Sequence, residues 1–124
     1  MNNKFLSKSL YVRGLQCPKS LWLKKYKRDV LDQNTDPAVF ETGNIVGELA
    51  CELFGGGKRI KFDGSSFDEN IAQTENFIKN GEKAIYEATF CFDEILVMVI
   101  LQVVDGKLVI NEVKSSTSLS DAYV

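Results

Sequence analysis

The sequence predicts an α+β domain of the α/β sandwich type, in which helices come first and an antiparallel sheet follows. Up to Gly81 the chain carries apolar residues at helical spacing behind clear helix-start signals. After Gly81 it carries three β-type runs joined by two-residue turns, and Asp105-Gly106 is a strong type I′ hairpin signal. The 124 residues fit one domain, with a basic helical arm over 1–28, a helical part over 36–83 and a β-meander over 84–117.

The helical part is defined by its capping residues. Ser7 is a candidate N-cap, Pro18 suits the first turn of a second helix, and Asp36-Pro37 combines a capping carboxylate with proline at the first helical position. Gly55 lies where a C-cap glycine is expected. We therefore expect helices over 6–15, 18–27, 37–53 and 67–79, a loop over 29–35 and a short strand over 59–62.

Glycines mark two places in this part of the chain. Gly43 and Gly47 share one face of the third helix and cost about 1 kcal/mol each relative to alanine, so we expect a close approach there by another backbone or by a ligand. The run Gly55-Gly56-Gly57-Lys58 is no phosphate-binding loop, because it follows a helix and Arg59 stands where that motif needs serine or threonine. We interpret it as a flexible turn.

Three strands are expected over 84–92, 95–104 and 107–115. The second is apolar on both faces, which predicts a central strand that is covered on each side.

Composition excludes several classes of function. The chain contains no histidine, so catalysis must use carboxylates, lysines or hydroxyls. Its three cysteines form no C-x-x-C pair, which argues against a zinc ribbon or a thioredoxin-like site. No apolar run is long enough to span a bilayer and no signal-peptide core is present. We expect a cytoplasmic protein without a membrane partner.

Charge is distributed unevenly. Residues 1–28 hold eight basic residues and no acidic one, whereas the rest of the chain holds 7 basic and 17 acidic residues. This pattern fits either a surface that binds nucleic acid or a lysine-rich solvated helix face. The candidate nucleic-acid contacts are Lys19, Lys24, Lys25 and Arg28.

Two carboxylates stand out in the expected sheet. Alternation places Glu112 and Lys114 on one face of the third strand, with apolar neighbours, and Glu87 on one face of the first strand with Ile85 and Thr89. A bare E-x-K tripeptide is compatible with a cross-strand salt bridge as well as with a catalytic site.

Four ordered segments carry a resemblance to a known superfamily. They are Leu6-Ser7-Lys8-Ser9 with Gly14-Leu15-Gln16-Cys17-Pro18-Lys19-Ser20-Leu21-Trp22-Leu23, then Gly43-x-x-Val46-Gly47-Glu48-Leu49-Ala50, then Tyr86-Glu87-Ala88-Thr89-Phe90, and finally Glu112-Val113-Lys114-Ser115-Ser116-Thr117. In this order they resemble a bacterial domain family of unknown function in the PD-(D/E)XK nuclease superfamily, close to the RecB-like and CRISPR-associated exonucleases.

The resemblance implies a metal-dependent nuclease, a hydrolase that acts on the phosphodiester bonds of nucleic acid, with DNA the expected partner. Glu112 would bind Mg²⁺ or Mn²⁺, and Lys114 would orient the attacking water or stabilise charge on the phosphate. Glu48 would be an outer metal ligand, and Glu87 would support the site from the first strand. Hard oxygen ligands and a nearby cation suit this chemistry.

Cys17-Pro18 resembles the first ligand of an iron–sulfur cluster found in some of these nucleases. Cys51 and Cys91 lie in an expected helix and strand, so four suitable ligands are not available. We therefore expect no cluster in this chain and interpret Cys17 as a buried structural thiol.

One carboxylate of the superfamily pattern is missing. Relatives would carry an aspartate on the second strand, where this chain reads Val97-Met98-Val99-Ile100-Leu101. The two-residue turn pairs Glu112 with Val99, and one aspartate inserted after Val99 would face Glu112. A one-residue deletion therefore predicts a bulge or altered pairing on the second or third strand near Val99.

The chain also stops soon after the third strand, where the superfamily core continues with a helix and another strand. We expect a partial, truncated core with an open sheet edge that favours self-association. Three interpretations remain: a partial nuclease domain that is weak or inactive, a non-catalytic nucleic-acid-binding or protein-interaction module on the same scaffold, and an α+β domain whose E-x-K is only a salt bridge.

Overall fold

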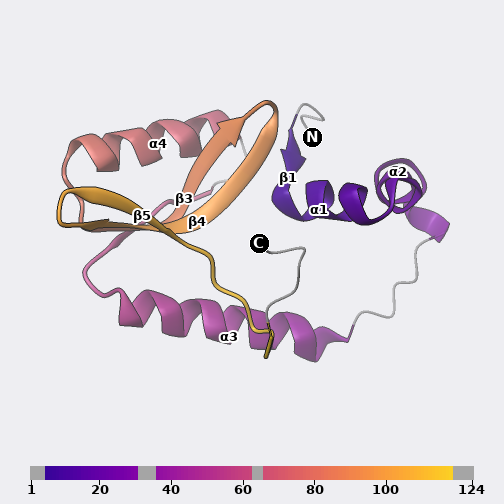
Figure 1. Ribbon diagram of the computed structural model, residues 1–124, viewed down its shortest axis with the longest axis horizontal. Coiled ribbons are helices and arrows are strands. Elements are labelled where there is room, and N and C mark those ends of the chain that lie inside the picture. Colours follow the sequence, from indigo (N-terminus) through magenta and orange to yellow (C-terminus); the bar gives the residue numbers. More distant parts are fainter. Residues whose placement is uncertain (1–4, 31–35, 63–65, 119–124) are drawn as a thin grey trace.

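The protein is a mixed α+β domain in the computed structural model, which describes residues 5–30, 36–62 and 66–118 (Figure 1). The helices in these ranges are α1 (Lys8–Gln16), α2 (Pro18–Tyr26), α3 (Pro37–Leu53) and α4 (Phe67–Lys79), with a short 3-10 helix η1 at Arg28–Val30. The α+β prediction is confirmed, and each expected helix is present with ends within two residues of the predicted ones. The expected loop over 29–35 begins in η1, and its residues 31–35 lie outside the described ranges.

The helix starts follow from capping. Ser7 Oγ accepts a hydrogen bond from the Leu10 N–H at 3.4 Å, and Asp36 Oδ1 accepts one from the Ala38 N–H at 2.9 Å. Ser66 Oγ caps α4 in the same way, at 3.1 Å from the Asp68 nitrogen. Each bond satisfies an N–H that the helix itself leaves unpaired.

The sheet is mixed, which corrects the expected antiparallel meander. Its strands are β1 (Leu6–Ser7), β2 (Lys58–Arg59), β3 (Ala84–Phe92), β4 (Ile95–Val104) and β5 (Lys107–Asn111), in the order β1-β4-β3-β2, with β5 also paired to β4. β3, β4 and β5 are antiparallel in succession, but β1 joins β4 in parallel and β2 joins β3 in parallel. β5 covers only the Ile100–Val104 end of β4, which leaves the other end of the same edge open for β1.

The third strand is shorter than expected. The β4–β5 register runs regularly from Val104–Lys107 to Ile100–Asn111, as the type I′ turn predicts, and it ends there. Glu112 and Lys114 therefore lie just beyond the strand, not on it. Three residues of β5 have exposed apolar side chains: Leu108, Val109 and Ile110. β5 pairs with no other strand within the described residues, and self-association through its edge stays a prediction.

A β-bulge interrupts β3 and changes which side chains share a face. Ile85 pairs with Leu101, but Ala88 pairs with Val99, so β3 carries one extra residue at this point. Glu87 has φ of +58°, a left-handed conformation that is uncommon outside glycine. Ile85 packs in the cluster on the α4 side, whereas Tyr86 packs with Ala50 of α3. The expectation that Ile85 and Glu87 share a face is therefore wrong, because the bulge breaks the alternation between them.

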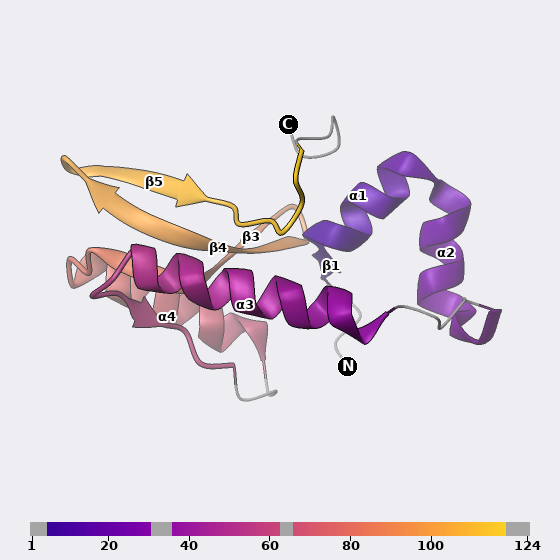
Figure 2. The same ribbon diagram turned by 90° about the horizontal axis from the view of Figure 1, so that it is seen from below.

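The two helices α3 and α4 lie on opposite sides of the β3–β4 pair (Figure 1). On the α3 side, Ala50 packs with Tyr86 and Ile100, and on the α4 side Phe77 and Ile78 pack against a cluster that includes Leu101. β4 is thus central and covered on both sides, as its apolar sequence predicts. α1 and α2 form a sharply bent helix pair that projects away from these layers in both views (Figure 2).

The glycine turn after α3 is fixed against the core. The Gly57 N–H donates to Tyr86 Oη at 3.1 Å, and that hydroxyl donates to the Phe54 carbonyl at 2.9 Å. A Cβ atom at Gly57 would stand only 2.5 Å from the Tyr86 ring. This segment is a turn, as expected, and glycine is required at Gly57 because the ring lies so close.

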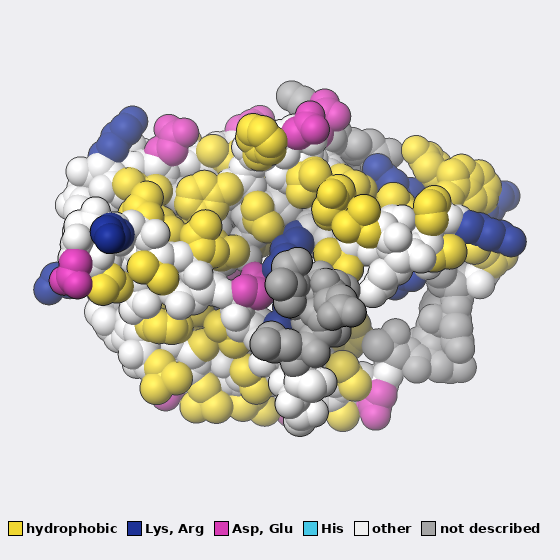
Figure 3. Space-filling view, viewed as in Figure 1, with side chains coloured by type: hydrophobic (Ala, Val, Ile, Leu, Met, Phe, Trp, Pro, Cys, Tyr) yellow, Lys and Arg dark blue, Asp and Glu magenta, His cyan; other side chains and the backbone are white. Residues whose placement is uncertain are grey.

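α3 buries little of its apolar surface. Only Ala50 is buried, and the larger hydrophobic side chains of the helix point into solvent: Val39, Phe40, Ile45, Leu49 and Leu53. Figure 3 shows hydrophobic side chains gathered along the lower edge of the molecule, where α3 runs. Among the described residues no helix combines the length and apolar character needed to cross a bilayer.

Candidate functional site

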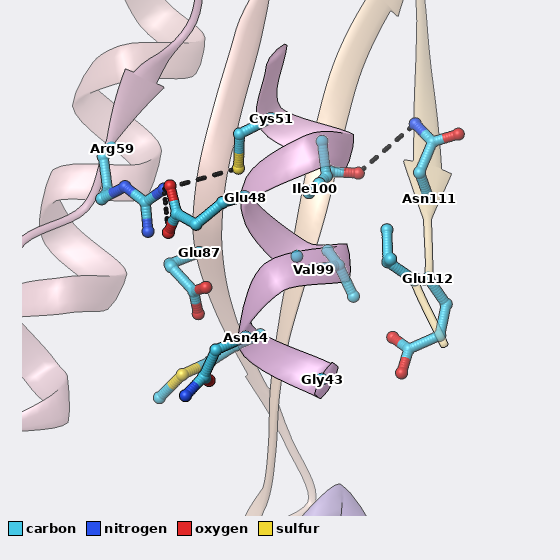
Figure 4. A pocket seen from close by; sticks show the side chains of 13 residues that line it. Gly43, Asn44, Glu48, Cys51, Arg59, Glu87, Val99, Ile100, Asn111 and Glu112 are labelled. Atoms are coloured by element: carbon cyan, nitrogen blue, oxygen red, sulfur yellow. Dashed lines mark hydrogen bonds and ion pairs between the residues drawn. The ribbon is translucent and has the colours of Figure 1, made fainter. Parts of the chain in front are cut away.

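Three carboxylates predicted as site residues line one cavity. Glu48 comes from the middle of α3, Glu87 from the β3 bulge and Glu112 from the segment that follows β5 (Figure 4). The cavity has a volume of about 320 Å³ and is bounded by α3 on one side and by β4 on another. We call it the acidic cavity. The fold thus brings together groups that are far apart in the sequence.

Glu48 is bound by a cation that the sequence did not indicate. Both of its carboxylate oxygens accept from Arg59 Nη2, at 3.0 and 3.1 Å, and the same nitrogen lies 3.5 Å from Cys51 Sγ (Figure 4). Burial is the largest cause of a raised pKa at the Cys51 thiol, Arg59 opposes it, and the Glu48 and Glu87 carboxylates add to it. Cys51 therefore stays a neutral thiol and is a poor ligand for a hard cation.

Glu87 reaches the acidic cavity because of the bulge. Its backbone is left-handed, and within the described residues its carboxylate has no hydrogen bond or ion pair. The positive φ of Glu87 destabilises the backbone locally, and no contact of its exposed carboxylate with the described residues offsets this. Strained backbone of this kind is concentrated at functional sites.

Glu112 is held by two lysines. Lys8 Nζ of α1 lies 2.9 Å from Glu112 Oε1, and Lys114 Nζ lies 3.0 Å from the same oxygen. The prediction paired Glu112 with Lys114 alone. Lys8 is brought in by β1, whose parallel pairing with β4 places the first turn of α1 beside the chain that leaves β5.

These contacts change the acidity of Glu112. Burial by itself raises the pKa of its carboxyl, but the hydrogen bonds and charges of Lys8 and Lys114 lower it by more, and the pKa lies below its ordinary value of 4.5. The ionised form is therefore favoured in the folded protein.

This lowered pKa predicts a loss of stability in acid. Because the carboxyl is more acidic in the folded chain, its contribution to the free energy of unfolding is complete above the unfolded-state pKa and disappears as the pH falls through the folded-state pKa. Glu112→Gln should lose this part of the pH dependence. Urea unfolding of both proteins between about pH 6 and about pH 3 tests this, and parallel curves would contradict it.

The β4 wall of the acidic cavity is apolar. Met98, Val99 and Ile100 line it, and β4 carries no acidic residue. The β4–β5 ladder contains no bulge and ends at Ile100–Asn111, before the expected Val99–Glu112 pair. Altered pairing near Val99 is present in the β3–β4 ladder, where the extra residue lies on β3, and the deletion itself stays a hypothesis. Glu112 thus has no carboxylate partner on β4.

Gly43 and Gly47 of α3 also border this cavity. Among the described residues no atom would lie within 4 Å of a Cβ added at either one, so no described backbone makes the expected close approach, and an approach by a ligand stays a prediction. The two glycines leave open space on the α3 wall.

Two of the three carboxylates are already paired with cations. Arg59 contacts Glu48, and Lys8 and Lys114 contact Glu112. No group of three carboxylate or thiol side chains among the described residues is close enough to hold a metal as placed. A divalent ion at this site would have to replace lysine or arginine contacts.

The predicted nucleic-acid residues lie on α2 and η1, apart from the acidic cavity. Lys19, Lys24 and Lys25 are on α2, and Arg28 begins η1 and donates from Nε to the Lys24 carbonyl at 3.3 Å. Trp22 of α2 is exposed and packs against Tyr26.

Cys17 is exposed at the junction of α1 and α2, so its interpretation as a buried thiol is wrong. A helix junction on the surface of the projecting α1–α2 pair offers no core to enclose it. Cys51 and Cys91 are half-buried on α3 and β3. Nothing in this arrangement joins the three into a cluster site.

Sequence reasoning missed Lys8 and Arg59, because both act across long sequence separations. The only available signal was that Lys8 lies inside the first of the four ordered segments. Comparison of the chain with protein-family models, with curated proteins and with solved structures finds no match, so the resemblance to the nuclease superfamily stays a prediction.

Proposed function

We propose that the acidic cavity is a divalent-metal site for phosphodiester hydrolysis, and that the chain is a nuclease-like domain acting on nucleic acid, with DNA as the expected substrate. The observation that supports this most is the convergence of Glu48, Glu87 and Glu112 on one cavity from three separate parts of the chain. A second support is that Lys114 Nζ stands 3.0 Å from Glu112 Oε1, so the carboxylate and the ammonium of the E-x-K segment lie together at the cavity.

The donor set fits a hard cation. Carboxylate oxygens are the ligands that Mg²⁺ and Mn²⁺ prefer, and the neutral Cys51 thiol does not favour a softer metal. Glu112 would be the principal ligand, with Glu48 as an outer ligand and Glu87 supporting the site from the bulge. When bound, the ion would polarise the phosphate and make a bound water more acidic. Lys114 would orient that water or stabilise charge on a phosphoryl oxygen.

The proposal includes the expectation that catalysis is weak or absent. The β4 wall offers only apolar side chains, and Arg59 and Lys8 already occupy two of the carboxylates. With fewer ligand oxygens the ion is held less tightly and its position is less fixed, and catalysis depends on position.

The α1–α2 helix pair provides the positive charge that a nucleic-acid backbone needs. Residues 8–28 carry basic side chains and no acidic one. Phosphate contacts by Lys19, Lys24, Lys25 and Arg28 would hold the strand without reading its sequence.

A second candidate function is a non-catalytic nucleic-acid-binding module on the same scaffold. The contact of Lys8 and Lys114 with one oxygen of Glu112 favours it, because the carboxylate is then neutralised without any metal. Binding of DNA that weakens steeply with salt and needs no divalent ion would support this alternative.

The proposed function is tested by calorimetric titration of Mn²⁺. We expect the wild-type protein to bind one ion weakly, with a dissociation constant of roughly 10⁻⁴ to 10⁻³ M, and Glu112→Ala to lose this binding. Glu41→Gln removes an exposed carboxylate from α3 outside the cavity and is the matched control, which should bind as the wild type does. Absence of binding in all three proteins would sink the metal site.

A further inference from the structure

A second cavity adjoins the acidic cavity, and Glu112 and Met98 line both. Its volume is about 480 Å³. Its polar lining comes from the start of α1 and from the segment after β5: Ser7, Lys8, Ser9, Glu112 and Lys114. We call it the lysine cavity. Glu112 and Met98 form the wall between the two cavities, so a group bound in one lies next to a group bound in the other.

Two ammonium groups converge at the wall of the lysine cavity. Lys8 and Lys114 place them within 3.0 Å of a single carboxylate oxygen of Glu112, which is the one acidic side chain among the described lining residues. The N-terminus of α1 also borders the lysine cavity, and its partial positive charge adds to that of the two lysines. An anion with several oxygens matches this arrangement better than one carboxylate does.

We propose that the lysine cavity is a phosphate site, and that Lys8 exchanges its contact with Glu112 for a phosphoryl oxygen of the substrate when a divalent ion binds Glu112. This inference rests on the proposed function and adds a second residue, Lys8, to the binding of the substrate phosphate. In the metal-free protein Lys8 holds Glu112 and competes with the ion for it.

The exchange follows from simple electrostatics. A divalent ion on Glu112 repels two nearby ammonium groups, and Lys8, about one third exposed on a flexible four-carbon stem, can turn away. A phosphate bound in the lysine cavity gives the Lys8 ammonium group a new partner. Metal and phosphate therefore bind more tightly together than separately, and this coupling must be equal in both directions.

The test uses ¹H–¹⁵N NMR titrations of the metal-free protein, with Mg²⁺, inorganic phosphate and a dinucleoside monophosphate as probes. In the wild type, Mg²⁺ should tighten dinucleotide binding about fivefold, and the dinucleotide should tighten Mg²⁺ binding by the same factor. In Lys8→Gln, Mg²⁺ alone should bind about fivefold more tightly, the dinucleotide should bind more weakly, and the coupling should fall to the part that comes from direct attraction between ion and phosphate.

Lys107→Gln removes an exposed lysine at the far end of β5 and is the matched control; it should behave as the wild type does. Lys8→Arg keeps the charge and should retain the coupling. Wild-type affinities and coupling in Lys8→Gln would overturn the inference. Stronger binding of inorganic phosphate than of the dinucleotide would overturn its assignment to a nucleic-acid backbone.

The two proposals fail separately. If Mg²⁺ binds the wild type but the phosphate probes show no dependence on Lys8, the metal site stands and the phosphate site does not. If Mg²⁺ binds neither protein while Lys8→Gln weakens dinucleotide binding, the phosphate contact stands and the proposed metal site does not.

Discussion

Met98→Asp is expected to tighten divalent-metal binding by about tenfold or more, because it gives β4 the carboxylate that the acidic cavity lacks. Met98 lines both cavities together with Glu112, and its side chain is 38% exposed, so a carboxylate there stays in contact with solvent. Ile100 faces the same side of β4 but packs in the core with Ala50, where an aspartate would be buried without a partner.

The matched control is Met98→Asn, which has nearly the same shape without the charge. Both variants introduce a residue that is disfavoured in strands and should lose similar stability, about 1 kcal/mol or less, whereas only the aspartate should gain metal affinity. Calorimetric titration with Mn²⁺ separates them, and a cleavage assay on DNA shows whether added affinity restores chemistry. Equal metal binding in the two variants would mean that Glu112 and Met98 do not face a common ion.

Much of this fold could be predicted because its signals are local. Ser7, Asp36 and Ser66 cap their helices through contacts two or three residues away, and the Asp105-Gly106 turn sets the β4–β5 register by itself. A type I′ turn needs positive φ at both central residues, and Asp105 and Gly106 have +51° and +74°. Such features depend on neighbours in the sequence.

The bulge and the short strands were not predictable in the same way. Alternation predicts one face for Ile85 and Glu87, and only the pairing with β4 reveals the extra residue between Ile85 and Ala88. β1 and β2 are two residues long each and exist because the free edges of β4 and β3 are available to them. Their sequences contain no periodicity from which a strand could be recognised.

The carboxylates of the site and Lys114 were named from the sequence, but the other two cations, Lys8 and Arg59, were missed. Glu87 and Glu112 were recognisable because carboxylates among apolar residues are informative exceptions, whereas Glu48 was expected only from the resemblance to the nuclease superfamily. Lys8 and Arg59 look like ordinary surface residues in the sequence, and their roles appear only when β1 and β2 bring them to Glu112 and Glu48. The difference matters for function, because these cations decide how easily a metal ion can reach the carboxylates.

Glu87→Gly is expected to stabilise the fold by about 1 kcal/mol while it weakens metal binding. Glu87 has φ of +58°, a conformation that glycine adopts without steric cost, and its carboxylate makes no ion pair or hydrogen bond with the described residues. Relief of the backbone should therefore exceed any interaction lost. Urea unfolding measures the gain, and Mn²⁺ calorimetry measures the loss of the third carboxylate in the acidic cavity.

Two variants separate the backbone from the carboxylate. Glu87→Ala removes the carboxylate but keeps a Cβ atom, so it should weaken metal binding without the gain in stability. Glu94→Gly relieves a similar φ of +63° in the β3–β4 turn, outside the acidic cavity, so it should stabilise the fold and leave metal binding unchanged. A glutamate in a left-handed conformation is not explained by stability alone. If Glu87→Gly raises the free energy of unfolding and weakens metal binding, the function of the bulge is to place Glu87 as a metal ligand. A loss of stability in Glu87→Gly would instead show that the glutamate side chain supports the bulge, and Glu87 would then have a structural role.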